Sequence, residues 1–590
     1  MGFPFASDLL GVMDPIRFAA TDRRRVGTGY MSSPRPPKTT AVSPAASAEL
    51  STTRRFAIDW LPAGLLVWMF LACCFPLFDT DLFWHLKTGE WILQNLTIPG
   101  YDLYTFTDFD KRWIDLHWGF EVGAAILYRI GGANLLILAK AGILMLALGI
   151  GCYAGGPNLR GWQRVLCWVL PAITISGRGY ERPEIITVLC LASWLWIIPR
   201  LELRPRLIWW LPALQIFWIN CHALYILGLV VGGCYAVDYI ARSLAEGKFG
   251  LAPAPLEPGP STVIRAAGLC AAAALVNPYF EEGALFPFVL FRKFTVEQEF
   301  YSIHIGEFQK PINFLLKNGF VNLYLNAEIL VWVAAAVSFV WLAARGRVNV
   351  FRSLLFVGFS YLAWKASRNT NIFSIIAGYV LTENVGEIIA RNRGSSSPEL
   401  PRSLNSPLPQ RVVGVVLVMM IAAVVTGEWN RWAEKIRPFR LGEIREWFPH
   451  KAALFMRHPG YPQRVFAANF GVASVYTYYN GPQGKVFMDG RLEVCTQQTF
   501  ERYNDISLRM SSAHPSWAEL LRDQAGNLPA VMLDSRFSRH LISGVMQTPG
   551  WRLVYADPSC AVFFDEKTAD AFKLPAVDPE PLKLPPKLGS

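Results

Sequence analysis

The hydrophobic residues of this chain are concentrated in long runs that are separated by short polar segments. A helix that crosses a bilayer needs about 20 mainly apolar residues, and several of the runs are shorter than this. The pattern therefore predicts about 11–13 membrane-spanning helices in a transmembrane domain at 54–427. The runs cover residues 57–77, 117–131, 133–153, 163–177, 183–199, 207–220, 222–241, 262–279, 327–344, 351–367, 371–390 and 410–427.

The composition agrees with this pattern. Of the 590 residues, 52% are hydrophobic and 17% are charged, whereas soluble proteins are nearer to about 25% charged. Many of the 21 tryptophans flank the runs, as at Trp209–Trp210 and Trp429–Trp432, which is typical of the aromatic belts at membrane interfaces. The sequence thus indicates a polytopic α-helical membrane protein.

The net charge of +11 does not indicate a nucleic-acid partner. The basic residues form short clusters beside the hydrophobic runs, such as Arg54-Arg55, and charges in this position set membrane topology. Most of the ten cysteines lie in or beside the runs and are expected to pack as small apolar side chains. Cys495 and Cys560 lie in the C-terminal region, where a disulfide between them is an open alternative.

The basic clusters also predict the orientation of the chain. Arg54 and Arg55 precede the first span, which predicts a cytoplasmic N-terminus in the cell inner membrane and a first loop, 77–117, on the outside. Strict alternation of the short runs would then place the basic loop Arg200–Arg206 outside as well, against the charge rule. A half-span or broken helix between 155 and 222 would remove this conflict, and W-I-N-C-H at 218–222 is a candidate for the break.

The segments outside the runs have distinct characters. Residues 1–53 lack periodicity and are expected to be a disordered tail. In the first loop, Asp81–Asn95 predicts an interfacial helix, and the stretch that follows it contains a hairpin candidate. A second large loop covers 280–326. Residues 428–575 alternate short β-like runs with amphipathic stretches, which predicts a small α/β soluble domain that we expect on the outside, and 576–590 is expected to be a disordered tail.

The first candidate site follows the first span. Asp79, Asp81, His85 and Lys87 lie within a few residues of one another, and Asp81 and His85 share a face of the predicted helix. Two carboxylates can act as a general base toward a hydroxyl or hold Mg²⁺ or Mn²⁺. The structural alternative is that Asp79 or Thr80 caps the helix and Asp81 favours its positive end.

The far end of the same loop repeats this composition. Asp115, His117 and Glu121 run directly into the next apolar run, so they are expected to return to the membrane surface near Asp79. Boundary residues between the interface anchors Trp113 and Trp118 are the structural alternative.

Polar groups inside apolar runs are costly unless they are paired or hydrated, so they are functional candidates. Arg178, Arg182, Asn220 and His222 are of this kind, and arginine can bind a phosphate through two parallel hydrogen bonds. Pairing of Arg178 with Glu181 or Glu184 in a short loop is the structural alternative.

Two further segments are expected to be structural rather than catalytic. His304 and Glu307 of the second loop could contribute to an acceptor site, but a solvated loop face is the preferred interpretation. Asp489-Gly490-Arg491 follows a β-like run and is expected to form a turn.

Several motifs resemble those of the GT-C superfamily of membrane glycosyltransferases, in particular an uncharacterised bacterial branch. They are D-T-D-L-F-W-H-L-K-T-G-E-W-I at 79–92, W-I-N-C-H-A-L at 218–224, N-P-Y at 277–279 and V-F-M-D-G-R at 486–491. The order of parts is similar too: a first span, an outer loop that opens with an acidic motif, many further spans and a soluble C-terminal domain.

This resemblance implies transfer of a sugar from a polyprenyl-phosphate donor to a glycan, lipid or protein acceptor on the outer face of the membrane. Asp79 or Asp81 would orient or deprotonate the acceptor, directly or through Mg²⁺ or Mn²⁺, and His85 would assist. Cationic Lys87, Arg178 or Arg182 would stabilise the departing phosphate. The remaining substrate-binding candidates are Asp115, His117, Asn220 and His222.

Two other functions stay open at this point. A transporter or flippase of lipid-linked glycans would line its path with Arg182, Asn220 and His222. A non-catalytic membrane scaffold would direct Asp79 and Asp81 away from any cavity.

Overall fold

A computed structural model describes residues 59–108, 110–245, 251–253, 255, 257–394, 407–433 and 437–582. All of them belong to one compact unit, Ile58–Ser590. The predicted disordered tail at 1–53 lies outside the described residues, as does 583–590.

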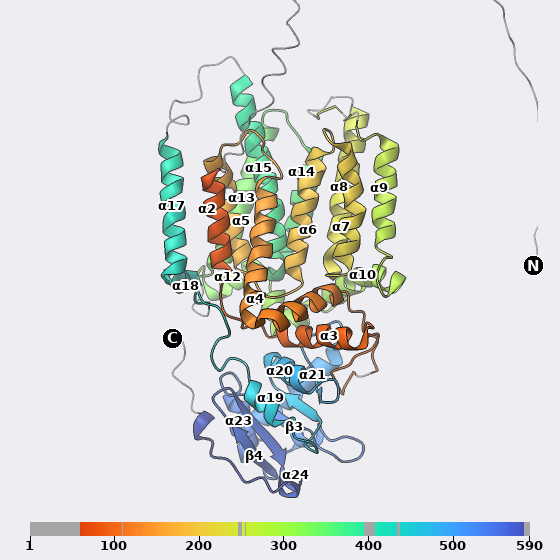
Figure 1. Ribbon diagram of the computed structural model, residues 1–590, viewed down its shortest axis with the longest axis vertical. Helices are drawn as coiled ribbons and strands as arrows, with labels where there is room; N and C mark the ends of the chain where they lie inside the picture. Colours follow the sequence, from red (N-terminus) through yellow and green to blue (C-terminus); the bar gives the residue numbers. More distant parts are fainter. Residues whose placement is uncertain are drawn as a thin grey trace, which may run out of the picture. The chain divides into compact units, whose positions relative to one another are not determined.

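The hydrophobic runs form a bundle of long helices, shown in Figure 1. Its members are α2 (Trp60–Ala72), α4 (Trp118–Cys152), α5 (Gly161–Ser176), α6 (Glu184–Ile197), α7 (Trp210–Ile219), α8 (Ile226–Ala245), α9 (Pro260–Ala273), α13 (Leu323–Ala343), α14 (Val350–Lys365), α15 (Thr370–Gly394) and α17 (Leu408–Val425). Within the described residues, five segments are long and apolar enough to cross a membrane on their own: Trp118–Cys152, Ala223–Ala245, Leu323–Ala343, Ser367–Arg391 and Leu408–Val425. The prediction of a polytopic α-helical membrane protein is confirmed.

Helix α4 unites two of the predicted runs. It is bent at Gly132, whose φ of 59° and ψ of −153° are a conformation that essentially only glycine adopts. Figure 1 shows its first half running beside α3, before the chain turns into the bundle. The predicted run 117–131 is therefore the lateral half of a bent helix rather than a separate span.

This bend resolves the conflict over the basic loop. Arg200 donates to the carbonyl oxygens of Tyr153 (2.6 Å) and Ala154 (2.9 Å), so its loop lies at the same end of the bundle as the α4–α5 connection. Asp59, at the start of α2, also lies against that connection. The proposed break at 218–222 was wrong, because this segment is the turn after α7 and no broken helix is needed.

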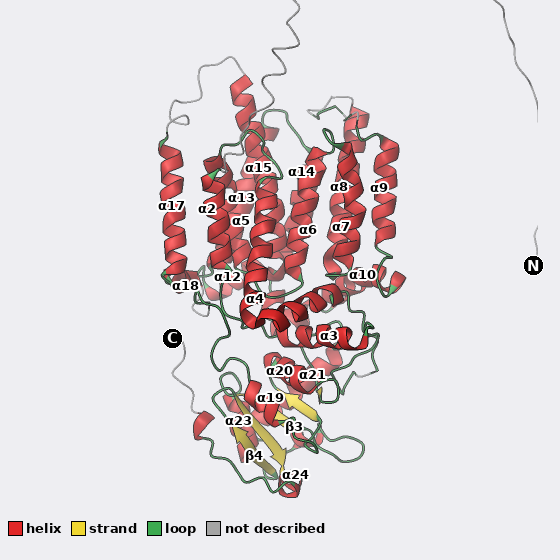
Figure 2. Cartoon of the chain, in the orientation of Figure 1, coloured by secondary structure: helices red, strands yellow, loops and turns green. Residues whose placement is uncertain are grey.

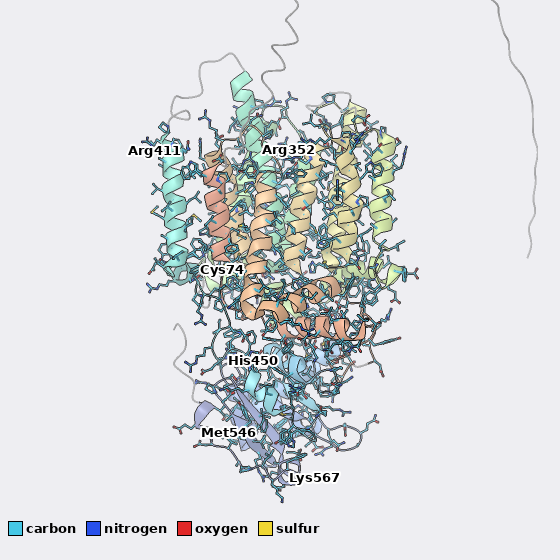
Figure 3. The ribbon with its side chains drawn as sticks, viewed as in Figure 1. Cys74, Arg352, Arg411, His450, Met546 and Lys567 are labelled. Atoms are coloured by element: carbon cyan, nitrogen blue, oxygen red, sulfur yellow. The ribbon has the colours of Figure 1, made fainter. Side chains whose placement is uncertain are left out.

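Short 3₁₀ helices lie between or beside the helices of the bundle. They are η1 (Ile198–Arg200), η2 (Pro205–Trp209), η3 (Ala223–Tyr225) and η5 (Ser367–Asn369), and α18 (Glu428–Ala433) follows α17. Figure 3 labels Arg352 and Arg411 at the end of the bundle remote from the C-terminal domain, and Cys74 at the near end. Cys74 directly precedes the first acidic motif, so that motif lies at the near end.

Both large loops are largely helical and lie at the near end (Figure 1). The first carries the predicted interfacial helix as α3 (Leu82–Asn95), and the second forms α10 (Phe280–Val296), α11 (Gln298–His304), η4 (Gly306–Phe308) and α12 (Pro311–Asn318). The predicted hairpin is present only in part. Tyr101 and Arg112 make one isolated antiparallel bridge, and Thr105 instead pairs with Val486 of the C-terminal domain.

The C-terminal region forms the predicted α/β domain, in which all strands of the described chain are found (Figure 2). Its sheet has the order β2-β1-β3-β5-β4, with β1 parallel to β2 and β3, and β5 antiparallel to β3 and β4. The strands are β1 (Arg464–Ala467), β2 (Lys485–Val486), β3 (Ala530–Asp534), β4 (Trp551–Ala556) and β5 (Cys560–Asp565).

Helices cover this sheet, and its core is apolar on both faces. They are α19 (His450–Phe455), α20 (Phe470–Asn480), α21 (Gln497–Ser511), α22 (Ser516–Glu519), α23 (Arg539–Gln547) and α24 (Glu566–Ala571). Cys495 and Cys560 are buried and free, so the disulfide alternative is wrong. The ordered chain extends past residue 575, because Val577 donates to Leu553 and η6 covers Glu580–Leu582.

Candidate functional site

Asp79 and Asp81 lie where the chain leaves α2 and enters α3. The carboxylate of Asp79 accepts a hydrogen bond from the backbone N–H of Asp81 (2.8 Å), so one oxygen of Asp79 shapes the turn. Asp81 is the residue before α3, yet its side chain makes no capping hydrogen bond. One oxygen of Asp79 and both of Asp81 thus remain for other partners.

Those partners meet at Arg182, in the short connection between α5 and α6. Its Nε lies 2.6 Å from Oδ2 of Asp79, and its Nη2 lies 3.0 Å from Oδ2 of Asp81. Its Nη1 lies 3.2 Å from Oε2 of Glu307, in η4 of the second large loop. Each guanidinium nitrogen therefore faces a different carboxylate, and the three carboxylates come from two loops far apart in sequence.

A buried ion pair anchors the connection that carries Arg182. Glu181 lies 2.5 Å from Nζ of Lys140 in α4, and both side chains are almost fully buried. Arg178, on the same connection, lies 3.3 Å from Glu184 and 3.5 Å from Glu307. The expected pairing of Arg178 with Glu184 is present, and Glu307 adds a second partner from the loop that was expected to be solvated.

The carboxyls of Asp81 and Glu307 differ in their tendency to ionise. Burial raises the pKa of Asp81 to about 7; Arg182 opposes this rise and the neighbouring Asp79 adds to it. Burial also raises the pKa of Glu307, but the attraction of Arg182, Arg178 and Arg368 outweighs it and lowers the pKa overall. At neutral pH the site thus holds a firmly ionised Glu307 beside an Asp81 that exchanges its proton.

Gly490 of the C-terminal domain closes one side of this group. A Cβ atom at Gly490 would lie 2.3 Å from Oδ1 of Asp81, which is closer than a real contact. The D-G-R turn therefore brings backbone against the Asp81 carboxylate, and the absence of a side chain is what permits that approach.

Three histidines form a second group next to the first. His85 of α3 lies 2.8 Å from Glu121 of α4, and its ring centroid is 6.0 Å from that of His117. The His117 ring is in turn 5.4 Å from that of His222, whose Nδ1 lies 2.7 Å from the Thr187 hydroxyl. Asp115 accepts from the backbone N–H of His117 (2.9 Å) and lies 3.6 Å from its Nδ1.

Arg368, in η5, lies close enough for its charge to act on residues of both groups. Its guanidinium stacks on Phe308 at 5.0 Å and makes no hydrogen bond or ion pair within the described part of the chain. Burial lowers the pKa of His117, Asp115 opposes this, and the charge of Arg368 adds to the lowering. Arg368 is thus a cation close to both groups whose hydrogen-bonding capacity is uncommitted.

Two sequence candidates lie elsewhere. The charges closest to Lys87 are those of Glu90 and Arg457, so Lys87 belongs to the contact between α3 and the C-terminal domain. Asn220 accepts from the indole N–H of Trp118 (2.9 Å) and donates to the carbonyl of Val276 (2.8 Å), so it fastens the α7–α8 turn. The structure gathers Asp79, Asp81, Arg178 and Arg182 in one group, and His85, Asp115, His117 and His222 in the other.

Sequence reasoning did not assign three residues to this site. Glu307 and Arg368 lie in segments whose charges also fit a solvated loop or a topology signal, and Gly490 was expected to serve a turn. A signal existed for Glu307: it is the acid of a largely apolar stretch, S-I-H-I-G-E-F. What the sequence could not give is the convergence of the two loops.

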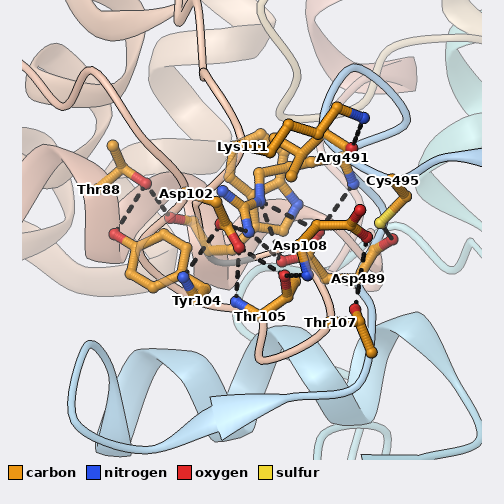
Figure 4. A network of polar contacts seen from close by, with 12 residues as sticks. Thr88, Asp102, Tyr104, Thr105, Thr107, Asp108, Lys111, Asp489, Arg491 and Cys495 are labelled. Atoms are coloured by element: carbon orange, nitrogen blue, oxygen red, sulfur yellow. Dashed lines mark hydrogen bonds and ion pairs between the residues drawn. The ribbon is translucent and has the colours of Figure 1, made fainter. Parts of the chain in front are cut away.

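A buried ionic network holds the C-terminal domain against the site (Figure 4). Arg491 donates to Asp489 (2.7 Å) and to Asp102 of the first loop (2.6 Å), and none of the three side chains is exposed to solvent. Asp102 also accepts from the backbone N–H groups of Tyr104 (3.1 Å) and Thr105 (2.9 Å). The Arg491 guanidinium packs 4.5 Å from the Trp113 ring. The turn expected at 489–491 is present, and it also fastens two parts of the protein together.

The expectation of a divalent cation at Asp79 and Asp81 can be compared with the donors present. Each of the two carboxylates faces a nitrogen of Arg182. Among the described residues, no group of three or more His, Cys, Asp or Glu side chains has an arrangement that would hold a metal ion. The carboxylates as arranged do not fit an ion.

Comparison with known proteins adds the fold. No family model and no curated protein matches the chain. The apo oligosaccharyltransferase of Archaeoglobus fulgidus is similar in structure, with a TM-score of 0.50 and 12% identity over 87% of this chain and 75% of that one. ArnT from Cupriavidus metallidurans matches with a TM-score of 0.43 and 12% identity over 88% of this chain and 98% of that one.

The protein is a polytopic membrane protein with a GT-C-like fold and a C-terminal domain built on a small mixed sheet. This confirms the fold that the motifs of the sequence suggested.

Proposed function

We propose that the protein is a membrane glycosyltransferase that moves a sugar from a polyprenyl-phosphate donor to an acceptor hydroxyl or amide. The observation that carries this proposal is the group of Asp79, Asp81 and Glu307 around Arg182, with the uncommitted guanidinium of Arg368 beside it. The group lies where the ends of membrane helices meet the C-terminal domain. A lipid-linked donor and a water-soluble acceptor can meet only at such a boundary.

In the proposed reaction Asp81 is the base, and the lipid phosphate is the leaving group. Asp81 takes the proton from the acceptor, and the acceptor atom forms a bond to C1 of the sugar. The bond between C1 and the phosphate oxygen breaks, and the lipid phosphate leaves with the electron pair. A base whose pKa lies near 7 suits the first step, because a substantial fraction of it is ionised at neutral pH and it still accepts a proton readily.

The departing phosphate needs positive charge. Arg368 is the best placed of the site cations, because its hydrogen bonds are uncommitted within the described residues while Arg182 and Arg178 are engaged by carboxylates. Arginine matches a phosphate through parallel N–H donors. The sequence assigned this role to Lys87, Arg178 or Arg182, and the structure favours Arg368.

We further propose that the site and the C-terminal domain face the outside of the inner membrane. Arg200 and the start of α2 share the opposite end of the bundle, where positive charge favours the cytoplasm. The convergence of Asp79, Asp81 and Glu307 on Arg182 brings acids of two distant loops together, an arrangement that a non-catalytic scaffold does not require.

Loss of the acids tests the transfer. In the source organism, a deletion strain is complemented with the wild-type gene or with Asp79→Asn together with Asp81→Asn, and the envelope glycans are compared by mass spectrometry. We expect the double variant to give the profile of the deletion strain, because no base remains to accept the acceptor proton. An unchanged profile with the double variant at wild-type protein levels would contradict the proposal.

Binding of the lipid provides a test without an acceptor. Undecaprenyl phosphate is titrated into the purified full chain and followed by native mass spectrometry. Arg368→Gln is expected to weaken binding about tenfold, because one charge-assisted contact contributes about 1.4 kcal/mol or more. Arg522→Gln, on an exposed arginine paired with Glu519 in the C-terminal domain, is the control and should bind like the wild type. Equal binding by the Arg368 variant would remove this residue from the donor site.

A further inference from the structure

The three carboxylates around Arg182 are arranged for a guanidinium rather than for a metal ion. The distances from Nε to Asp79, from Nη2 to Asp81 and from Nη1 to Glu307 are 2.6, 3.0 and 3.2 Å. A guanidinium is planar, and its nitrogens point outward from the central carbon. Oxygens bound at its rim are therefore spread more widely than those around Mg²⁺ or Ca²⁺, which lie about 2.0–2.6 Å from the ion.

Arg182 is also held in place by more than these contacts. The preceding residue, Glu181, is tied to Lys140 inside the bundle, and Tyr180 lies 5.7 Å from the Arg182 guanidinium carbon. Burial lowers the pKa of Arg182, but the charges of Asp79, Glu307 and Asp81 outweigh it, so the side chain keeps its positive charge. Arg182 is thus fixed in position, and each of its three guanidinium nitrogens faces a carboxylate, which distinguishes this arrangement from a chance surface contact.

We propose that Arg182 takes the place of a divalent cation in this site, so that the protein carries its own fixed charge and needs no metal ion there. The guanidinium neutralises one of the three acids, and Arg178 and Arg368 lie close enough to act on the remaining charge at Glu307. Unlike an ion, this charge cannot be exchanged or removed by a chelator. This inference rests on the proposed function for the role of the site. Binding of a divalent ion to the site, however, can be measured without any transfer reaction.

Manganese titration of the full chain tests the inference. The protein is purified in detergent, treated with EDTA, exchanged into chelator-free buffer and titrated with Mn²⁺, and free ion is measured by electron paramagnetic resonance. We expect the wild type to bind no stoichiometric Mn²⁺, because Arg182 occupies its carboxylates. Arg182→Gln frees the three acids and is expected to bind one Mn²⁺ per chain, at least about tenfold more tightly than the wild type.

Three further variants locate the effect. Arg182→Lys keeps a cation and should gain no binding, whereas Arg182→Gln combined with Glu307→Gln should lose most of the gain. Arg522→Gln removes an exposed arginine far from the acids in sequence and is the matched control. Thermal unfolding of each variant in the same detergent shows that it is folded.

Two results would overturn the inference. One is a wild-type protein that binds one Mn²⁺ per chain and loses it in Asp81→Asn, an arm that does not depend on the folding of any Arg182 variant. The other is a folded Arg182→Gln that binds no more Mn²⁺ than the wild type. Neither result bears on sugar transfer, so a failure here is distinct from a failure of the proposed function.

Discussion

At the scale of single residues, the site depends on acids that are neither fully exposed nor paired with only one partner. Asp81 touches Arg182 on one side and the Gly490 backbone on the other, and its side chain retains 18% of its exposure. Such a position favours a carboxyl that exchanges protons near neutral pH over one that is permanently ionised.

This position predicts a pH-dependent cost to stability. An unfolded Asp has a pKa of about 3.9, whereas burial raises the pKa of folded Asp81 to about 7. Between these values the folded state binds more protons, so the contribution of Asp81 is present at low pH and is lost as pH rises toward 7. Asp81→Asn resembles the protonated form and should escape that loss.

Thermal unfolding in detergent measures the effect. The Tm of Asp81→Asn relative to wild type is expected to increase from pH 5 to pH 8.5, because only the wild type gains the penalised charge. Asp505→Asn serves as the control, since Asp505 is 45% exposed and pairs with Arg509 on the surface of α21. A difference in Tm between Asp81→Asn and wild type that stays constant across this pH range would contradict the raised pKa.

The sequence identified most of these residues but not their partners. Asp79, Asp81, His85, Arg178 and Arg182 stand out because charges beside or inside apolar runs need an explanation. Glu307 and Arg368 can be noticed in the same way, but a loop acid fits a solvated face better and an arginine before a helix fits a topology charge equally well. Only the packing of the second loop against the α5–α6 connection makes them part of the site, and contacts so distant in sequence leave no periodic signal.

At the scale of elements, the bend in α4 is decisive. It turns one continuous apolar stretch into a lateral half that carries Glu121 and a half that enters the bundle. Hydropathy divides the stretch at Gly132 into the runs 117–131 and 133–153, but it does not show that the first of them lies beside α3 instead of crossing the membrane. Counting these two halves as separate spans is what placed the basic Arg200–Arg206 loop on the outside under strict alternation.

A matched pair of glycines tests the bend. Gly132→Ala places a side chain in a conformation that is strained by about 1–3 kcal/mol, and α4 should either lose stability or straighten. Gly142→Ala lies in the same helix with a helical backbone and no atom within 4 Å of its added Cβ. It should be neutral or slightly stabilising, because alanine has the higher helix propensity.

The two variants are compared by thermal unfolding and by binding of undecaprenyl phosphate, measured without added Mn²⁺. Gly132→Ala should lower Tm by several degrees and weaken lipid binding, since it moves the helix that presents Glu121 to His85. Equal behaviour of the two variants would show that the bend at Gly132 is not required.

At the scale of the whole molecule, the C-terminal domain is part of the site and not an appendage. The sequence predicted its α/β character from short β-like runs, but gave no reason to join it to the first loop. That joint is made by Arg491 and by the pairing of Thr105 with Val486. Lys293 of the second large loop adds hydrogen bonds to the carbonyl oxygens of Leu492 and Cys495. Gly490 reaches Asp81 because its neighbour Arg491 is fixed in this way.

Removal of the Arg491 charge should therefore loosen the joint as well as the domain. Arg491→Met leaves Asp102 and Asp489 buried without their cation, and breaking a buried pair in this way costs about 3–5 kcal/mol. Arg464→Met is the comparison, since Arg464 pairs with Asp523 on the surface and its loss should cost about 0–1 kcal/mol.

Limited proteolysis distinguishes a loosened joint from general instability. In Arg491→Met we expect faster cleavage within the first loop at 100–116. We also expect a lower affinity for undecaprenyl phosphate, because Asp81 loses the backbone that faces it. Asp102→Asn tests the same joint from the membrane side, where it keeps the side-chain volume and removes one charge. A contrary result would be that both variants lower Tm but leave the first loop as resistant to cleavage as in the wild type. The ionic network would then stabilise the C-terminal domain alone. The link from that domain to the acids would have to run through Thr105 and Lys293 instead.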